Sequence, residues 1–160
     1  MLSYAFDLLY AIYEEEGYNA LVGWLRVVVQ ATNGTEAVTL ARQQQPDVIL
    51  MDEPLGALDA LTREKMQSLV LKLWKETGKT IILITHSVEE ALLLGERLVV
   101  MAPRPGRIHK EYRLPFAEMG VGADLREVKK SEGFSETRDE ILSMIWEMEE
   151  EIMGRSETAK

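Results

Sequence analysis

The chain has 160 residues, enough for one compact domain with its own core, and its 46% hydrophobic and 28% charged residues are typical of a globular protein. Its formal net charge of −9 argues against a general nucleic-acid-binding protein, because neutralising phosphates requires clustered lysine and arginine. The sequence contains no cysteine, which excludes disulfide bonds and thiolate metal sites and fits a reducing compartment.

The first third of the sequence predicts two helices separated by a strand. Leu2–Glu16 has the apolar spacing of an amphipathic helix and ends at Gly17. Trp24–Ala31 is rich in β-branched residues and predicts a buried strand, and Asn33–Gln45 predicts a helix after a turn. No stretch reaches the roughly 18 apolar residues of a membrane span, so we expect none.

The middle of the sequence predicts two short, continuously apolar strands, Asp47–Met51 and Thr80–Thr85. Strands of this kind are expected where helices cover both faces of a parallel sheet. The segment between them, Ala60–Gly78, predicts a long amphipathic helix that ends at its glycine. A further helix is expected to open with Ser87 and Glu90 as a capping box.

The last part of the sequence predicts two more strands, a linker and a final helix. Arg97–Ala102 predicts a third buried strand, and the alternating polarity of Gly106–Leu114 predicts a fourth, more exposed one. After Pro115 the sequence is polar, and Thr137 with Glu140 predicts a capping box that opens the final helix. Trp74 and Trp146 are expected on apolar helix faces in the core. The final helix has one apolar stripe that could dock on a partner but is expected to pack on the chain's own sheet, and it consists of Ile141, Ile145, Met148 and Ile152.

Strands that alternate with helices predict an α/β fold with a three-layer parallel sheet, flavodoxin-like or P-loop-like. We expect a single α/β domain over residues 1–115, followed by a linker and a C-terminal amphipathic helix over residues 116–160. In such sheets ligands bind beyond the carboxyl ends of the strands. That rule predicts that Asp52, Glu53 and His86, each just after a buried strand, lie along one edge.

These three side chains suit phosphate chemistry when taken together. A carboxylate such as Asp52 can hold Mg²⁺ together with substrate phosphates, and a neighbouring carboxylate such as Glu53 can orient or deprotonate a water. A histidine on the next strand can reach a terminal phosphate. Taken singly, Asp52 and Glu53 could merely begin a turn and His86 could merely precede a helix, but the combination favours a site.

The sequence from Pro46 onward resembles the second half of an ABC transporter ATP-binding subunit, of the type found in nitrate, sulfonate and taurine importers. The residues that carry the resemblance are "VILMDEPLGALDALTRE" and "TGKTIILITHSVEEALLLGERLVVMAPRPGRI". The resemblance implies Mg²⁺ and ATP as cofactors, with Asp52 serving Mg²⁺, Glu53 as the catalytic base and His86 near the γ-phosphate. It also implies that Asp59 lies in the contact between two ATPase subunits.

The same resemblance implies a cellular role. The family hydrolyses ATP and drives the uptake of a small anion through a membrane permease, so a second ATPase subunit and a permease are the expected partners. The expected location is cytoplasmic or peripheral at the inner face of the plasma membrane.

The sequence departs from this family in its phosphate-binding parts. It contains no G-x-x-x-x-G-K-[ST] loop, and "TGKT" at Thr77–Thr80 precedes a strand where the loop should open a helix. No LSGGQ-like signature is present either. We therefore expect a partial or chimeric ATP-binding protein that does not hydrolyse ATP efficiently on its own.

The first third resembles a different family, the receiver domains of response regulators. The resemblance runs over residues 8–52 and rests on "YEEEGYNA" and "VVQATNGTEAVTLARQQQPDVILMD", and it implies that Asp52 accepts a phosphoryl group. The acidic pair and the Lys-Pro of that family are not found at the corresponding positions. Two alternatives to an importer subunit therefore stay open: a receiver-like signalling module phosphorylated on Asp52, and an inactive fusion or designed recombinant.

Overall fold

The computed structural model describes residues 34–44, 46–103 and 106–157, and these residues divide into two compact units. The first unit contains the described residues up to Pro54 together with Leu73–Ile84, and the second contains Leu55–Lys72 and the residues from Thr85 onward. The helix predicted at Leu2–Glu16 and the strand predicted at Trp24–Ala31 lie outside the described residues.

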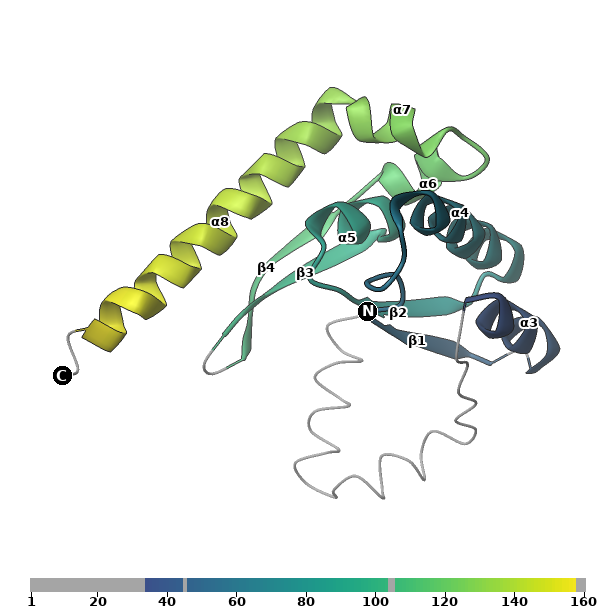
Figure 1. Ribbon diagram of the computed structural model, residues 1–160, viewed down its shortest axis with the longest axis horizontal. Coiled ribbons are helices and arrows are strands. Elements are labelled where there is room, and N and C mark those ends of the chain that lie inside the picture. Colours follow the sequence, from purple (N-terminus) through teal and green to yellow (C-terminus); the bar gives the residue numbers. More distant parts are fainter. Residues whose placement is uncertain (1–33, 45, 104–105, 158–160) are drawn as a thin grey trace, which may run out of the picture. The chain divides into compact units, whose positions relative to one another are not determined.

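The first unit is built around a sheet of two parallel strands (Figure 1). Its elements are α3 (Gly34–Gln44), β1 (Val48–Asp52), the last turn of α4 (Ala60–Thr77) and β2 (Thr80–Ile84). The parallel register pairs Val48 with Thr80 and Asp52 with Ile84, so the carboxyl ends of β1 and β2 are level. The predicted adjacency of these two strands is therefore confirmed.

Helix α4 ends where the sequence predicts. Gly78 has a φ of 62° and follows the helix directly, and its N–H donates to the carbonyl of Trp74 at 2.9 Å. This left-handed conformation costs glycine little because it has no Cβ atom, so Gly78 terminates the helix and turns the chain into β2.

Within residues 34–157, strand β1 is covered on one face only. Successive side chains of a strand point to opposite faces, and in β1 every second side chain is exposed. Val48 and Leu50 are 46% and 58% exposed, whereas Ile49 and Met51 are half-buried. The prediction of burial on both faces is therefore wrong for β1 among the described residues, because a continuous apolar run does not show which face of a strand is covered.

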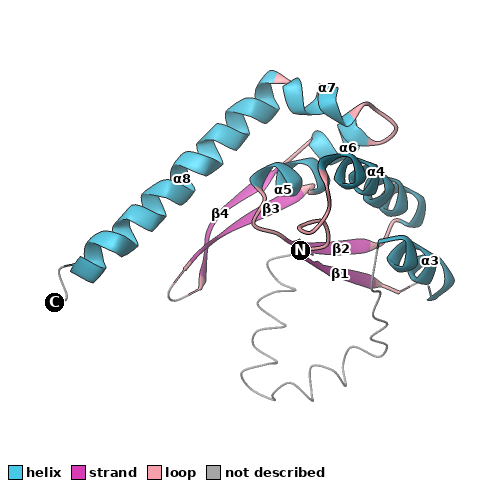
Figure 2. Ribbon diagram, in the orientation of Figure 1, coloured by secondary structure: helices cyan, strands magenta, loops and turns pink. Residues whose placement is uncertain are grey.

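The second unit contains a hairpin in place of a third parallel strand. Strands β3 (Arg97–Ala102) and β4 (Arg107–Arg113) pair antiparallel, with an irregularity between Val100 and Met101 (Figure 2). A parallel connection needs a crossover of a dozen or more residues, and the few residues between β3 and β4 permit only an antiparallel return. The α/β class is confirmed, but the described strands form two separate two-stranded sheets where one parallel sheet was expected.

Helices make up most of the rest of the second unit. They are the first part of α4, α5 (Val88–Leu94), α6 (Phe116–Gly120), α7 (Leu125–Lys130) and α8 (Glu132–Glu157). The segment predicted as a linker after Pro115 thus holds α6, α7 and the start of α8. None of the described helices has both the length and the apolar character needed to cross a membrane.

Helix α8 starts earlier than the sequence predicts. Thr137 lies inside the helix, and its hydroxyl donates to the carbonyl of Gly133 at 2.7 Å. Glu140 accepts hydrogen bonds from Lys110 at 2.6 Å and from the Tyr112 hydroxyl at 2.9 Å. The predicted Thr137–Glu140 capping box is therefore wrong, because both side chains have other partners.

The core of the second unit is apolar and includes an aromatic pair. The rings of Phe116 and Phe134 meet edge to face with centroids 5.0 Å apart, and Phe134 is fully buried. On α8, Ile141 is buried and Ile145 and Met148 are half-buried, as predicted. Trp146 is 60% exposed, so its predicted place in the core is wrong.

Candidate functional site

Asp52 and Glu53 lie at the carboxyl end of β1, beside the end of β2. Asp52 is the register partner of Ile84, and the N–H of Glu53 donates to the carbonyl of Ile84 at 2.9 Å. This hydrogen bond extends the pairing one residue beyond the strand. Both carboxylate side chains are exposed.

Glu53 has an unusual backbone conformation. Its φ is 44°, and it is the one residue other than glycine with a positive φ in the described part of the chain. A residue with a Cβ atom pays about 1–3 kcal/mol for this region, which therefore needs support from the surrounding structure. Such strain is frequent at functional sites, and here it falls on the predicted catalytic carboxylate.

A turn follows the two acids and is held by Arg63, a residue that no sequence motif marks. The Arg63 guanidinium donates from Nη2 to the carbonyl of Leu58 at 2.9 Å and from Nε to the carbonyl of Leu55 at 3.4 Å. The N–H of Leu58 also donates to the carbonyl of Leu55, at 3.2 Å. Arg63 thus anchors the turn before α4, a role without a sequence signature because arginine is common on helix surfaces.

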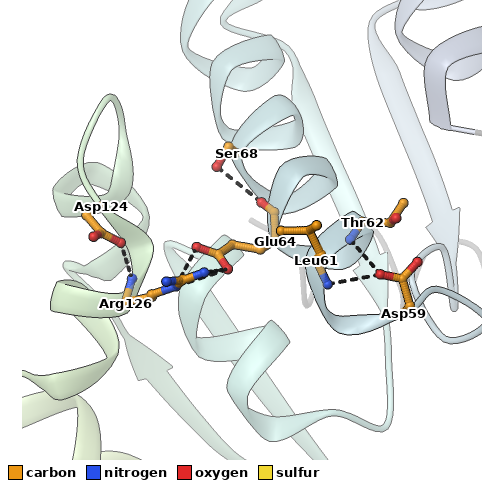
Figure 3. Close-up of polar contacts among 7 residues, drawn as sticks. All are labelled: Asp59, Leu61, Thr62, Glu64, Ser68, Asp124 and Arg126. Atoms are coloured by element: carbon orange, nitrogen blue, oxygen red, sulfur yellow. Dashed lines mark hydrogen bonds and ion pairs between the residues drawn. The ribbon is translucent and has the colours of Figure 1, made fainter.

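Asp59 caps the N-terminus of α4 (Figure 3). Its Oδ1 accepts the N–H groups of Leu61 and Thr62, each at 3.1 Å. The hydroxyl of Thr62, then its N–H, then the N–H of Leu61 favour the ionised form and lower the pKa of Asp59 below its usual value. The side chain predicted to lie in a subunit contact is thus also a helix cap in the chain itself.

The first turns of α4 are joined to α7 by an ion pair, which Figure 3 shows beside the Asp59 cap. Arg126 donates from Nε and Nη2 to the two carboxylate oxygens of Glu64 at 3.1–3.2 Å. The N–H of Arg126 donates to Asp124 at 2.9 Å, which caps α7. The two-point geometry fixes the angle between the partners better than a single contact would.

His86 lies on a short connection between β2 and α5. Its neighbours fix this connection: the Thr85 hydroxyl oxygen accepts the N–H of Ser87 at 3.1 Å, and the Ser87 hydroxyl oxygen accepts the N–H of Glu90 at 3.4 Å. The predicted cap at Ser87 is confirmed. The His86 side chain is exposed at this position.

The predicted site residues divide between the two units. Asp52 and Glu53 belong to the first unit, and Asp59 and His86 belong to the second. Within the described residues, no group of three or more histidine and acidic side chains forms a metal-binding cluster. The level strand ends are confirmed, and the approach of His86 to the two acids stays a prediction.

The segment "TGKT" is not a phosphate-binding loop. Thr77 ends α4, with its hydroxyl donating to the carbonyl of Leu73 at 2.7 Å, and Thr80 begins β2. A phosphate-binding loop must follow a strand and open a helix, so that helical N–H groups face the phosphates. The order here is the reverse, as the sequence predicted.

The donor set at this edge fits a magnesium ion that is also bound by phosphate oxygens. Mg²⁺ prefers oxygen ligands and often takes only one or two carboxylates from the protein. Asp52 offers an exposed carboxylate at the end of a parallel strand, where ligands of such sheets bind. Glu53, the next residue, provides a second carboxylate that can accept a proton from water.

No family model matches the chain, but curated relatives do. The chain is 84% identical over 127 residues to the taurine import ATP-binding protein TauB of Ruegeria pomeroyi, an alignment that covers 78% of this chain and 47% of the relative. It is 75% identical over 137 residues to the protein of the same name from Roseobacter denitrificans, covering 84% of this chain and 51% of the relative. A more distant relative of that name, from Burkholderia thailandensis, is 48% identical over 120 residues, covering 73% and 46%.

These alignments define the extent of the resemblance. Pro46–Lys160 makes up less than three quarters of the 160 residues, so an alignment that covers 84% of the chain includes residues before Pro46. The chain spans about half the length of the curated relatives it matches. Over the aligned residues, the resemblance to the ATP-binding subunits of ABC importers is confirmed.

Proposed function

We propose that this chain carries the carboxylate-bearing part of an ATP-binding site that powers the import of a small sulfonate such as taurine. The names of the curated relatives support both the nucleotide and the cargo. The observation that carries the proposal is the parallel register of β1 and β2, which sets Asp52 and Glu53 beside the end of the neighbouring strand.

Each predicted site residue has a role in this proposal. Asp52 binds Mg²⁺, which neutralises phosphate charge when nucleotide is present. Glu53 orients the attacking water and accepts its proton, and the positive φ of its backbone directs the chain sharply away from β1. His86 contacts the terminal phosphate, and Asp59 lies in the contact with a second ATPase subunit. A membrane permease is the proposed partner, at the inner face of the plasma membrane.

We expect this chain on its own to bind Mg-ATP only weakly. The sequence holds no G-x-x-x-x-G-K-[ST] loop, and so lacks a set of backbone donors and a lysine for the phosphates. Each charge-assisted hydrogen bond of this kind contributes about 1.5–3 kcal/mol. The expected dissociation constant is therefore weaker than about 1 mM, which corresponds to less than about 4 kcal/mol of binding free energy.

The site can be tested by titrating the purified chain with ATP in the presence and absence of Mg²⁺ while following backbone amide chemical shifts. We expect Mg²⁺-dependent shifts at Asp52, Glu53 and His86, lost in Asp52→Asn. The matched control is Asp47→Asn, which removes an exposed carboxylate just before the other end of β1 and should leave the shifts unchanged. Equal shifts in both variants, or shifts confined to other parts of the chain, would refute the assignment.

Two assays separate this function from the alternatives. Phosphate release by the chain alone should stay far below the rate of a transport ATPase. If the chain released phosphate at such a rate and Glu53→Gln abolished the release, the expectation of weak activity would be overturned. Incubation with acetyl phosphate and Mg²⁺, followed by intact mass, should show no added phosphoryl group. A phosphoryl group that is absent from Asp52→Asn would favour the receiver-like module instead.

A further inference from the structure

Helix α8 carries apolar side chains on a packed face and on an exposed flank beside it. On the packed face Ile141, Ile145 and Met148, spaced four and three residues apart, are buried or half-buried. On the exposed flank Trp146 and Met153 are 60% and 67% exposed. Seven residues are almost two helical turns, so Trp146 and Met153 lie one above the other. Trp146 lies about 100° around the helix from Ile145, so its exposed side chain extends the apolar surface beyond the side that packs on the core.

The exposed flank belongs to the part of α8 that lies beyond the described side-chain hydrogen bonds and ion pairs of this helix. The described side-chain hydrogen bonds and ion pairs of α8 come from residues before Ile141, including the bonds from Lys110 and Tyr112 to Glu140 and the ion pair of Arg138 with Glu89. Figure 1 shows the C-terminal half of α8, drawn in yellow, extending away from α5, α6 and α7. Trp146 and Met153 are therefore presented on a projecting helix.

Acidic side chains surround the two apolar ones. Residues 141–157 contain five glutamates and one arginine. Glu149 and Glu150 lie between Trp146 and Met153 on the same face of the helix, and both are exposed. The surface thus consists of two large apolar anchors separated by negative charge.

We propose that the face of α8 formed by Trp146, Glu149, Glu150 and Met153 is a docking surface for a basic amphipathic helix of another protein. Apolar side chains of such a helix would cover Trp146 and Met153, and its lysines or arginines would pair with Glu149 and Glu150. The negative charge of this surface favours a basic partner over an acidic one. A second copy would bring its own acidic α8, and the chain as a whole carries a net charge of −9. An anionic membrane surface would likewise be repelled.

This proposal is independent of nucleotide binding, and a synthetic peptide can test it. The probe is an amphipathic helix of leucine and lysine, titrated into the full chain while backbone amide shifts are recorded. We expect shifts concentrated in residues 142–153 and affinity at least about tenfold weaker in the double variant Trp146→Ala, Met153→Ala, because truncating a buried aromatic anchor removes a large part of binding energy. This variant keeps every charge, so purely electrostatic attraction would be unaffected.

Two controls make the result decisive. Leu61→Ala removes a leucine on α4 that is 58% exposed, and it should leave the affinity unchanged. A peptide with the same leucines and glutamate in place of lysine should not bind. Unchanged affinity in the double variant, binding of the acidic peptide, shifts outside α8, concentration-dependent dimerisation through α8, or binding to phosphatidylglycerol vesicles would each overturn the proposal.

Discussion

The two units of the molecule differ in how much apolar core the described residues supply. In the first unit the buried apolar side chains are those of Val38, Ala41, Leu73 and Ile82. The second unit buries a larger set, which comprises Leu55, Val70, Leu71, Leu92, Leu93, Leu98, Val100, Ala102, Leu114, Phe116, Ala117, Leu125, Val128, Phe134 and Ile141. Burial of apolar surface is the main source of stability, so these side chains are the chief stabilising contacts of the described part of the second unit.

The comparison separates exposed side chains proposed to bind ligands from buried side chains that stabilise the fold. The two carboxylates proposed for metal and water belong to the first unit, on an exposed strand end that includes a strained residue. The helix cap, the arginine anchor and the aromatic pair belong to the second. We therefore expect substitutions of the buried side chains of the second unit to act mainly on stability, and substitutions at the β1 end to act mainly on ligand binding.

The largest expected effect is that of Phe134→Ala. Phe134 is fully buried and meets Phe116 edge to face, so its truncation leaves a cavity and should lower the free energy of unfolding by about 3–5 kcal/mol. Urea denaturation followed by far-ultraviolet circular dichroism measures this loss. Trp146→Ala, which truncates an exposed aromatic residue on the same helix, should change the free energy by no more than about 0.5 kcal/mol. Similar losses for both variants would contradict the packing described for α8.

The next largest changes in stability are expected from alanine substitutions at two glycines of the second unit. A Cβ atom at Gly95 would lie 2.8 Å from the carbonyl oxygen of Ala91, so Gly95→Ala must shift the backbone at the end of α5 and should cost about 1–3 kcal/mol. Gly133 lies in the first turn of α8 with open space around it, so Gly133→Ala should raise stability by about 0.5–1 kcal/mol. The melting temperatures of the two variants should therefore shift in opposite directions. A shift of both in the same direction would contradict the surroundings described for Gly95 and Gly133.

A smaller effect is expected at Glu53. Glycine adopts a φ of 44° without a Cβ penalty, whereas alanine does not, so Glu53→Gly should be more stable than Glu53→Ala by about 1 kcal/mol. Both variants lose the same carboxylate, and the comparison therefore isolates the backbone strain. Chemical denaturation measures the difference. If alanine were the more stable substitution, Glu53 would not hold a strained backbone in solution.

The smallest effect is a pH dependence that comes from Asp59. Hydrogen bonds from Thr62 and Leu61 lower the pKa of this carboxyl in the folded state, so its stabilisation is present above the unfolded pKa of about 3.9 and is lost as the pH falls through the lower folded value. Asparagine caps helices about as well but does not titrate. Melting temperatures of Asp59→Asn should therefore fall less between pH 5 and pH 3 than those of the unchanged chain. If the melting temperatures of both proteins fell equally between pH 5 and pH 3, the cap would not stabilise the ionised form of Asp59.

Much of the local structure could be predicted from the sequence. The run "VILM" and the run "TIILI" became neighbouring parallel strands, and Gly78 ended α4 as its position indicated. Ser87 capped α5 because a hydroxyl at that place can accept a helical N–H group. The helix end and the cap depend on a few neighbouring residues, and the parallel pairing follows from the alternation of strands with helices, so both are visible in the sequence.

The errors arose where distant residues decide the structure. Thr137 and Glu140 fit a capping box, but the burial of Phe134 against Phe116 extends the helix past them towards its N-terminus. Trp146 fits an apolar helix face, but the side of α8 that faces the unit is set by Ile141 and its neighbours. The anchoring of Leu55 and Leu58 by Arg63 joins residues whose pairing no sequence pattern indicates.

The exposed side chains of β1 have a consequence for solubility. Among the described residues, Val48 and Leu50 expose an apolar segment of the kind that promotes self-association. Asp47 directly before the strand, and Asp52 and Glu53 at its end, supply the negative charge that keeps such a segment apart from its copies. The two acids proposed for chemistry therefore also act as aggregation gatekeepers, and neutral variants at these positions should precipitate at lower protein concentration than the unchanged chain.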